Sequence, residues 1–157
     1  MTNSAIPYTK IIQNNFLTIM NFAFSHAALE DLINHKFNGE FKFLNRVLFT
    51  DGEQRASRAF IDLAVYLRSL DDIEGLSKGN ENSYGTLTLP DENIIPLTIR
   101  EVSNKIIHSE SREWIFSQKD KPIFRCVPHK TDHQKNAWKS ADIDVVALAG
   151  FCGRLSY

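Results

Sequence analysis

The segment from Tyr8 to His35 constrains the fold more than any other part of the sequence, because it contains neither proline nor glycine. Its apolar residues recur at intervals of three and four, which is the spacing that places side chains on one face of an α-helix. This pattern predicts a long amphipathic helix whose apolar face must pack against other parts of the chain. The residues on that face are Ile12, Phe16, Ile19, Met20, Ala23, Ala27 and Ile33.

A second amphipathic helix is predicted to begin near Thr50 or Asp51, because either side chain can cap its first turn. Asp71 and Asp72 come at the end of this segment, where the helix dipole disfavours negative charge. We therefore expect the helix to fray just before these two carboxylates. Its apolar stripe consists of Ala56, Phe60, Leu63, Ala64, Leu67 and Leu70.

The second half of the chain alternates between polar loops and shorter periodic segments. Residues 75–85 are polar and contain glycine, which predicts a loop that joins two halves of one core. A third helix is predicted over residues 96–112, with Pro96 in its first turn. Residues 114–116 and 123–127 flank a polar turn and predict a β-hairpin. A last helix is predicted from Trp138, Ala141, Val145, Leu148 and Cys152.

These elements predict a mainly α fold: a bundle of four to five helices with a small β-hairpin inserted before the C-terminal helix. The chain has 157 residues, of which 43% are hydrophobic, and this suits one globular core. Neither half of the chain would bury enough apolar surface alone, so we expect residues 1–157 to form a single helical domain.

Charge and cysteine content narrow the class of protein. The formal net charge is -1, so no global field would draw the chain to nucleic acid or to an anionic membrane, although a local basic cleft is compatible with it. The sequence contains two cysteines, fewer than a small secreted scaffold normally carries. Neither a signal peptide nor an apolar stretch of about 20 residues is visible. We therefore predict a cytoplasmic protein with no membrane association.

The predicted third helix carries the best candidates for chemistry. Arg100, Asn104 and His108 are spaced four residues apart, so a helix would align them on one face, and Arg112 would extend this row. Histidine can transfer a proton near neutral pH, while arginine can neutralise a phosphate. The alternative is a solvated helix face, or polar side chains that hydrogen-bond within the core.

The run L-T-I-R-E-V-S-N-K-I-I-H at residues 97–108 is similar to the signature helix of HEPN domains. Members of this family are small helical bundles, common in prokaryotic toxins and defence proteins. Their catalytic pattern is an arginine, often followed by a polar residue, and then a histidine. Asn104 and His108 match the polar residue and the histidine. Ser103 stands at the expected position of the arginine, and Arg100 lies one turn earlier.

The resemblance implies an RNA-cleaving or RNA-binding protein of a defence or toxin–antitoxin system, in which two protomers face their signature helices across a two-fold axis. Cleavage would need no metal and no cofactor. His108 would act as general acid or base on the ribose 2′-hydroxyl, and Asn104 would hold the orientation. Arg100 or Arg112 would stabilise the transferring phosphate, and Arg112 and Ser103 would contribute to binding.

Two other functions stay open at the level of sequence. The first is a non-catalytic interaction module of the same fold, which would bind a protein partner or a nucleotide. The second is a small structural protein stabilised by zinc, because a Cys-x2-His-x3-His pattern provides ligands that zinc prefers. The four ligands would be Cys126, His129, His133 and, from the last helix, Cys152.

Overall fold

The computed structural model describes residues 7–36, 39, 42–129 and 138–155. Within these residues, no helix combines the length and the apolar character that a membrane-spanning segment requires. The helices of this part of the chain are α1 (Tyr8–His35), α2 (Lys42–Asn45), the π-helical segment η2 (Arg46–Asp51), α3 (Gly52–Glu74), α4 (Ile99–Ile107) and α6 (Val145–Arg154). The strands are β1 (Gly85–Thr88), β2 (Ile94–Pro96), β3 (Ser109–Ile115), β4 (Ile123–Pro128) and β5 (Ser140–Asp144).

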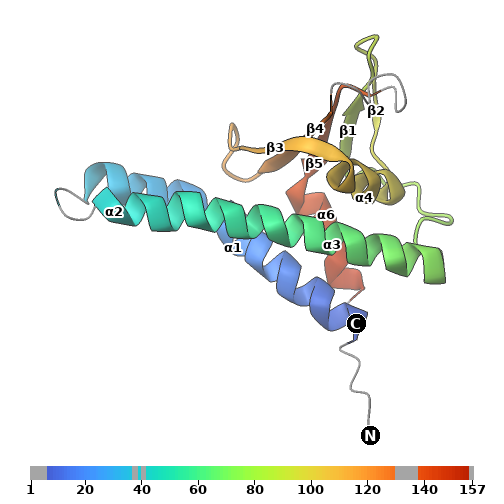
Figure 1. Ribbon diagram of the computed structural model, residues 1–157, viewed down its shortest axis with the longest axis horizontal. Coiled ribbons are helices and arrows are strands. Elements are labelled where there is room, and N and C mark those ends of the chain that lie inside the picture. The colour runs from blue at the N-terminus through green and yellow to red at the C-terminus, as the bar shows by residue number, and fades with distance from the viewer. Residues whose placement is uncertain (1–6, 37–38, 40–41, 130–137, 156–157) are drawn as a thin grey trace, which may run out of the picture.

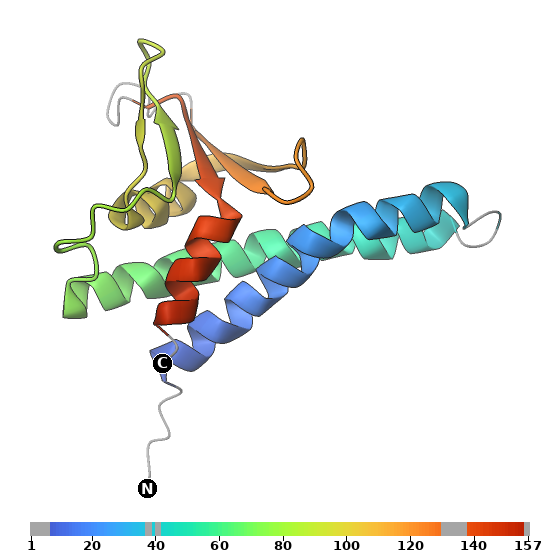
Figure 2. The ribbon, with the colours of Figure 1, turned by 180° about the vertical axis from the view of Figure 1, so that it is seen from behind.

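Two long helices and one antiparallel sheet dominate the structure. Helices α1 and α3 run side by side in opposite directions, and α6 packs against α1 (Figures 1 and 2). The five strands form a sheet in the order β2-β1-β5-β4-β3, in which every neighbouring pair is antiparallel. Helix α4 contacts α3 as well as strands β4 and β5, so it lies where the helices and the sheet meet.

The core is shared between the long helices and the sheet. The ring of Phe60, from α3, stacks on that of Phe124, from β4, with 4.1 Å between centroids and 5° between planes. Trp114 packs its edge against Phe124, and its indole Nε1 donates to Ser57 Oγ of α3 at 3.2 Å. Offset stacking of this kind adds to the free energy gained by burying the rings. The aromatic cluster therefore fixes the β3–β4 hairpin on α3.

The predicted bundle with one small hairpin is wrong, because the second half of the chain forms a five-stranded sheet. The last predicted helix is in fact strand β5 followed by α6. Ala141 and Ile143 are buried, while their neighbours in the strand are partly exposed, which is the alternation of a half-buried strand. Residues four apart, such as Ala141 and Val145, lie on the same face in a helix and also in a strand. The spacing of apolar residues therefore could not distinguish a helix from a strand here.

The predicted third helix is shorter at both ends than expected. Pro96 lies in the edge strand β2, and α4 begins only at Ile99. Thr98 caps α4: its Oγ1 accepts a hydrogen bond from Glu101 N at 3.4 Å, and Glu101 Oε2 accepts one from Thr98 N at 3.2 Å. The helix ends at Ile107, so Arg112 lies in β3 rather than on the helix.

Helix α3 runs to Glu74, past the point where fraying was predicted, because Asp71 and Asp72 are paired. Arg100 Nη1 lies 2.7 Å from Asp71 Oδ2 and 2.5 Å from Asp72 Oδ1. Burial alone would raise the pKa of Asp71, but hydrogen bonds from Ser77 and Arg100 outweigh it and hold that pKa below the usual value. The guanidinium of α4 thus neutralises the charges that the α3 dipole disfavours.

Candidate functional site

The last turn of α4 forms one wall of a polar pocket. Asn104, Lys105 and His108 line it together with Trp138, which lies just before β5. The pocket, named here the α4 pocket, has a cavity volume of about 150 Å³. Asn104 and His108, which the sequence placed on one helical face, do line the same cavity.

Asn104 is oriented by an arginine of α3. Arg68 Nη1 donates a hydrogen bond to Asn104 Oδ1, and Arg68 Nε lies 3.5 Å from Asp72 Oδ2. The carbonyl oxygen of Asn104 accepts this hydrogen bond, and its Nδ2 group can donate to a ligand. The Asn104 side chain is therefore suited to an acceptor such as an anionic oxygen.

Lys105 supplies a partly desolvated cation. Its Nζ lies 4.9 Å from the centroid of the Trp138 ring, within the range of a cation–π interaction. Burial lowers the pKa of Lys105 below its usual value, although the nearby Glu101 carboxylate acts in the opposite direction. An ammonium group that has lost part of its hydration gains more from a bound anion than one in open water does.

His108 closes α4 and is exposed to solvent. Its backbone N–H donates to Asn104 O at 3.0 Å, which makes it the C-terminal capping residue of the helix. An exposed imidazole beside a pocket can exchange protons with a bound ligand as well as with water. Among the described residues that line the pocket with it, the cation is Lys105.

Arg100 and Ser103 do not line the α4 pocket. The guanidinium of Arg100 is engaged by the Asp71 and Asp72 carboxylates at the end of α3. Ser103 is only 2% exposed, and its hydroxyl donates to Ile99 O at 3.5 Å within the helix. Arg100 thus ties α4 to the end of α3, and Ser103 is buried and bonded within its own helix.

Arg112 binds the end of α4 from strand β3. Its Nη2 donates to Ile106 O and to Ser109 O, each at 3.0 Å. A cation at a helix C-terminus interacts favourably with the dipole and satisfies carbonyl groups that have no helical partner. The Arg112 Nε atom is buried and makes no hydrogen bond with the part of the chain that the structure describes. Arg112 therefore acts as a positioning residue for the turn that ends at His108.

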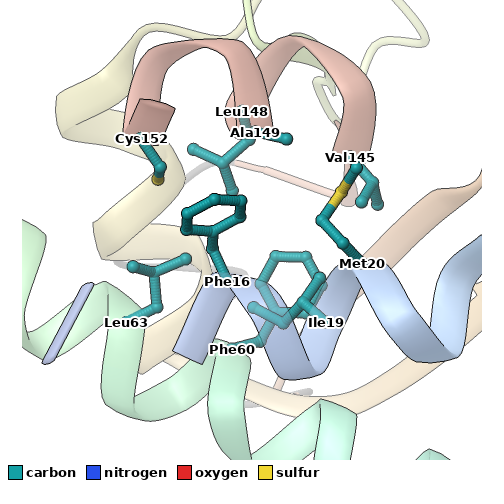
Figure 3. A pocket seen from close by; sticks show the side chains of 9 residues that line it. All are labelled: Phe16, Ile19, Met20, Phe60, Leu63, Val145, Leu148, Ala149 and Cys152. Carbon is teal, nitrogen blue, oxygen red and sulfur yellow. The ribbon is translucent and has the colours of Figure 1, made fainter. Parts of the chain in front are cut away.

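The predicted zinc ligands lie in different surroundings. Cys126 is buried in β4, and burial raises the pKa of its thiol to about 12. Cys152 lies among apolar side chains of α1, α3 and α6 (Figure 3), and burial raises its pKa to about 12 as well. His129 Nε2 lies 3.4 Å from Glu110 Oε1, and His133 falls outside the described residues. Among the described residues, no three or more His, Cys, Asp or Glu side chains form a group that could hold a metal ion.

Sequence reasoning missed three contributors to the site. Lys105 follows Asn104 directly and stands three residues before His108, so helical spacing could have identified it. Trp138 is buried, and no local pattern in the sequence connects it with α4. Arg68 lies on α3, far from Asn104 in the sequence, and contacts it only in the folded chain. Comparison with models of known protein families, with curated proteins and with solved structures found no match for this chain.

Proposed function

We propose that this protein binds RNA at the α4 pocket, with a backbone phosphate seated against Lys105 and with His108 placed to move a proton. One observation carries the proposal: a partly desolvated ammonium and an exposed imidazole line one small polar cavity. The pocket thus combines charge for a phosphate with a group for proton transfer, on a helix that is itself anchored by ion pairs.

The shape of the pocket favours the phosphate over the base as the group it holds. Trp138 is only 1% exposed and its ring is contacted by Lys105, so its indole offers a nucleotide base little surface to stack on. A cavity of about 150 Å³ is small, and hydrogen-bond donors of Asn104 and Lys105 line it. Contacts of this kind position a nucleic-acid backbone without reading its sequence.

The same groups supply the parts of a metal-independent cleavage reaction. His108 would accept the proton of a ribose 2′-hydroxyl, and the resulting 2′-oxygen would attack the adjacent phosphorus. The bond from phosphorus to the 5′-oxygen would break, which leaves a 2′,3′-cyclic phosphate and a 5′-hydroxyl that takes up a proton. Lys105 would stabilise the negative charge that develops on the phosphate oxygens.

A non-catalytic module that binds RNA at the same pocket is the second candidate. The engagement of the two arginines favours it, because Arg100 binds carboxylates and Arg112 binds backbone carbonyls. A site that relies on one lysine has less charge to stabilise a transition state than one with an added guanidinium. RNA binding without cleavage would identify this second function.

The proposal predicts that Lys105→Gln weakens the binding of a fluorescently labelled single-stranded RNA by roughly ten- to a hundred-fold, because it removes one charge-assisted phosphate contact. The measurement is fluorescence anisotropy at two salt concentrations, since losing one contact also flattens the salt dependence. Lys121→Gln is the matched control: Lys121 is exposed, pairs with Asp144 and lies in the turn between β3 and β4, outside the residues that line the α4 pocket. Equal effects of the two variants would refute a phosphate site at Lys105.

A further inference from the structure

Helix α1 exposes an apolar stripe on the side opposite the core. Leu17 is 56% exposed and Phe24 is 43% exposed, and both lie on the same face of the helix as the exposed residues Asn21 and Ala28. These four positions follow one another at intervals of four, three and four, which is the spacing of a coiled-coil seam. Large apolar side chains arranged in this way indicate a contact surface rather than scattered exposure.

The residues of the stripe are complementary to those of a second, antiparallel copy of the same helix. Leu17 and Phe24 lie at nearly equal distances before and after Asn21, and so do Lys10 and Asp31 at the ends of the same face. Lys10 is exposed, and the Asp31 side chain is 71% exposed even though its Oδ1 lies 3.1 Å from His35 Nδ1 of the same helix. Two α1 helices aligned in opposite directions about Asn21 would place each lysine beside an aspartate and each leucine beside a phenylalanine. A parallel, in-register pair would instead bring like charges together, which is unfavourable.

We propose that α1 binds α1 of a second copy of this chain, antiparallel, around a two-fold axis at Asn21. Leu17 packs against the partner's Phe24, and Lys10 pairs with the partner's Asp31. The two Asn21 side chains meet at the axis, where paired amides can hydrogen-bond and fix the alignment. A two-fold interface of this kind uses the same patch on both subunits, as the stripe requires. The surface is separate from the α4 pocket, so this proposal stands independently of RNA binding.

Sedimentation velocity of the full chain tests the proposal. The wild type is expected to form a dimer at micromolar concentration, and Phe24→Asp is expected to raise the dimer dissociation constant at least roughly ten-fold. Val65→Asp is the matched control, because Val65 is 46% exposed on α3 and lies outside the stripe. Circular dichroism spectra of the variants are the control that each of them is folded. A wild type that stays monomeric up to about 100 μM, or a dimer that Phe24→Asp leaves intact, would overturn the proposal.

Charge reversal tests the antiparallel alignment itself. Lys10→Glu and Asp31→Lys should each weaken the dimer several-fold, because each brings like charges together across the interface. The double variant should restore the wild-type dissociation constant, since it only exchanges the partners of each pair. Failure of the double variant to recover the dimer would contradict this alignment.

A disulfide offers a second test that does not depend on affinity. Asn21→Cys should form a covalent dimer under mild oxidation, because the two side chains meet at the axis. Thr18→Cys is the control, since Thr18 is exposed on α1 but lies off the stripe. The native cysteines, Cys126 and Cys152, are buried. Equal cross-linking of the two variants, or none for Asn21→Cys, would rule out an axis at this residue.

Discussion

Replacing His108 with alanine is expected to slow RNA cleavage by about 10²- to 10⁴-fold, which is the usual contribution of a positioned general base. The affinity for RNA should change little, because Lys105 still binds the phosphate. The fold should also survive, since the His108 side chain is exposed and only its backbone caps α4. The measurement is a single-turnover assay with an end-labelled RNA in EDTA, with binding measured in parallel.

His129→Ala is the matched control for this experiment. His129 is also exposed, and it lies beside Glu110 rather than in the α4 pocket. Its removal should leave both cleavage and binding unchanged. Cleavage by the His108→Ala protein at the wild-type rate would contradict a catalytic role for His108. Wild-type protein that binds RNA and leaves it intact would instead identify the non-catalytic module.

The Gly85→Ala variant should lose about 3 to 5 kcal/mol of unfolding free energy, because a methyl group there adds both backbone strain and an overlap. Gly85 has a φ of +144°, which L-amino acids rarely adopt, and it pairs with Ile143 of the neighbouring strand. A Cβ atom there would overlap with the backbone carbonyl oxygen of Asp142, which cannot move without breaking the sheet. Urea denaturation measures the loss.

The Gly79→Ala variant measures the cost of backbone strain without the steric overlap that is expected at Gly85. Gly79 also has a positive φ, of +71°, but no heavy atom lies within 4 Å of a Cβ built there. The expected loss is about 1 kcal/mol, the strain of the left-handed conformation alone. Losses of equal size at Gly85 and Gly79 would mean that β1 does not lie against β5 as described.

The long helices could be predicted because their sequences are unambiguous. The predicted bounds of α1, Tyr8–His35, agree with the structure, since no helix breaker interrupts a sustained period. The sheet could not be predicted in the same way. Strands β1 and β2 are short, and β2 contains Pro96. The burial pattern of β5 passes without a phase change into α6. Only tertiary pairing distinguishes such segments from loops and helices.

In the candidate site, too, contacts within one helix could be predicted from the sequence, and contacts between distant segments could not. Helical spacing alone was enough to bring Asn104 and His108 together, because Asn104 lies in α4 and His108 caps its C-terminal end. Arg100 does not line the pocket because Asp71 and Asp72 bind its guanidinium, and these carboxylates are close to it only in the folded chain. The contact of Trp138 with Lys105 likewise joins segments that are distant in the sequence. Charge compensation between elements thus decided which polar residues are engaged and which line the pocket.

The ionisation of Lys105 in the presence of RNA is the most direct test of the central claim, that the α4 pocket binds a phosphate of RNA. NMR of protein with ¹³C-labelled lysine follows the Lys105 Cε resonance as the pH is raised. In the free protein, burial should hold the pKa of Lys105 below its usual value. A short RNA should raise that pKa, because a neighbouring phosphate favours the charged ammonium. A Lys105 pKa that stays unchanged in the presence of the RNA would contradict the account.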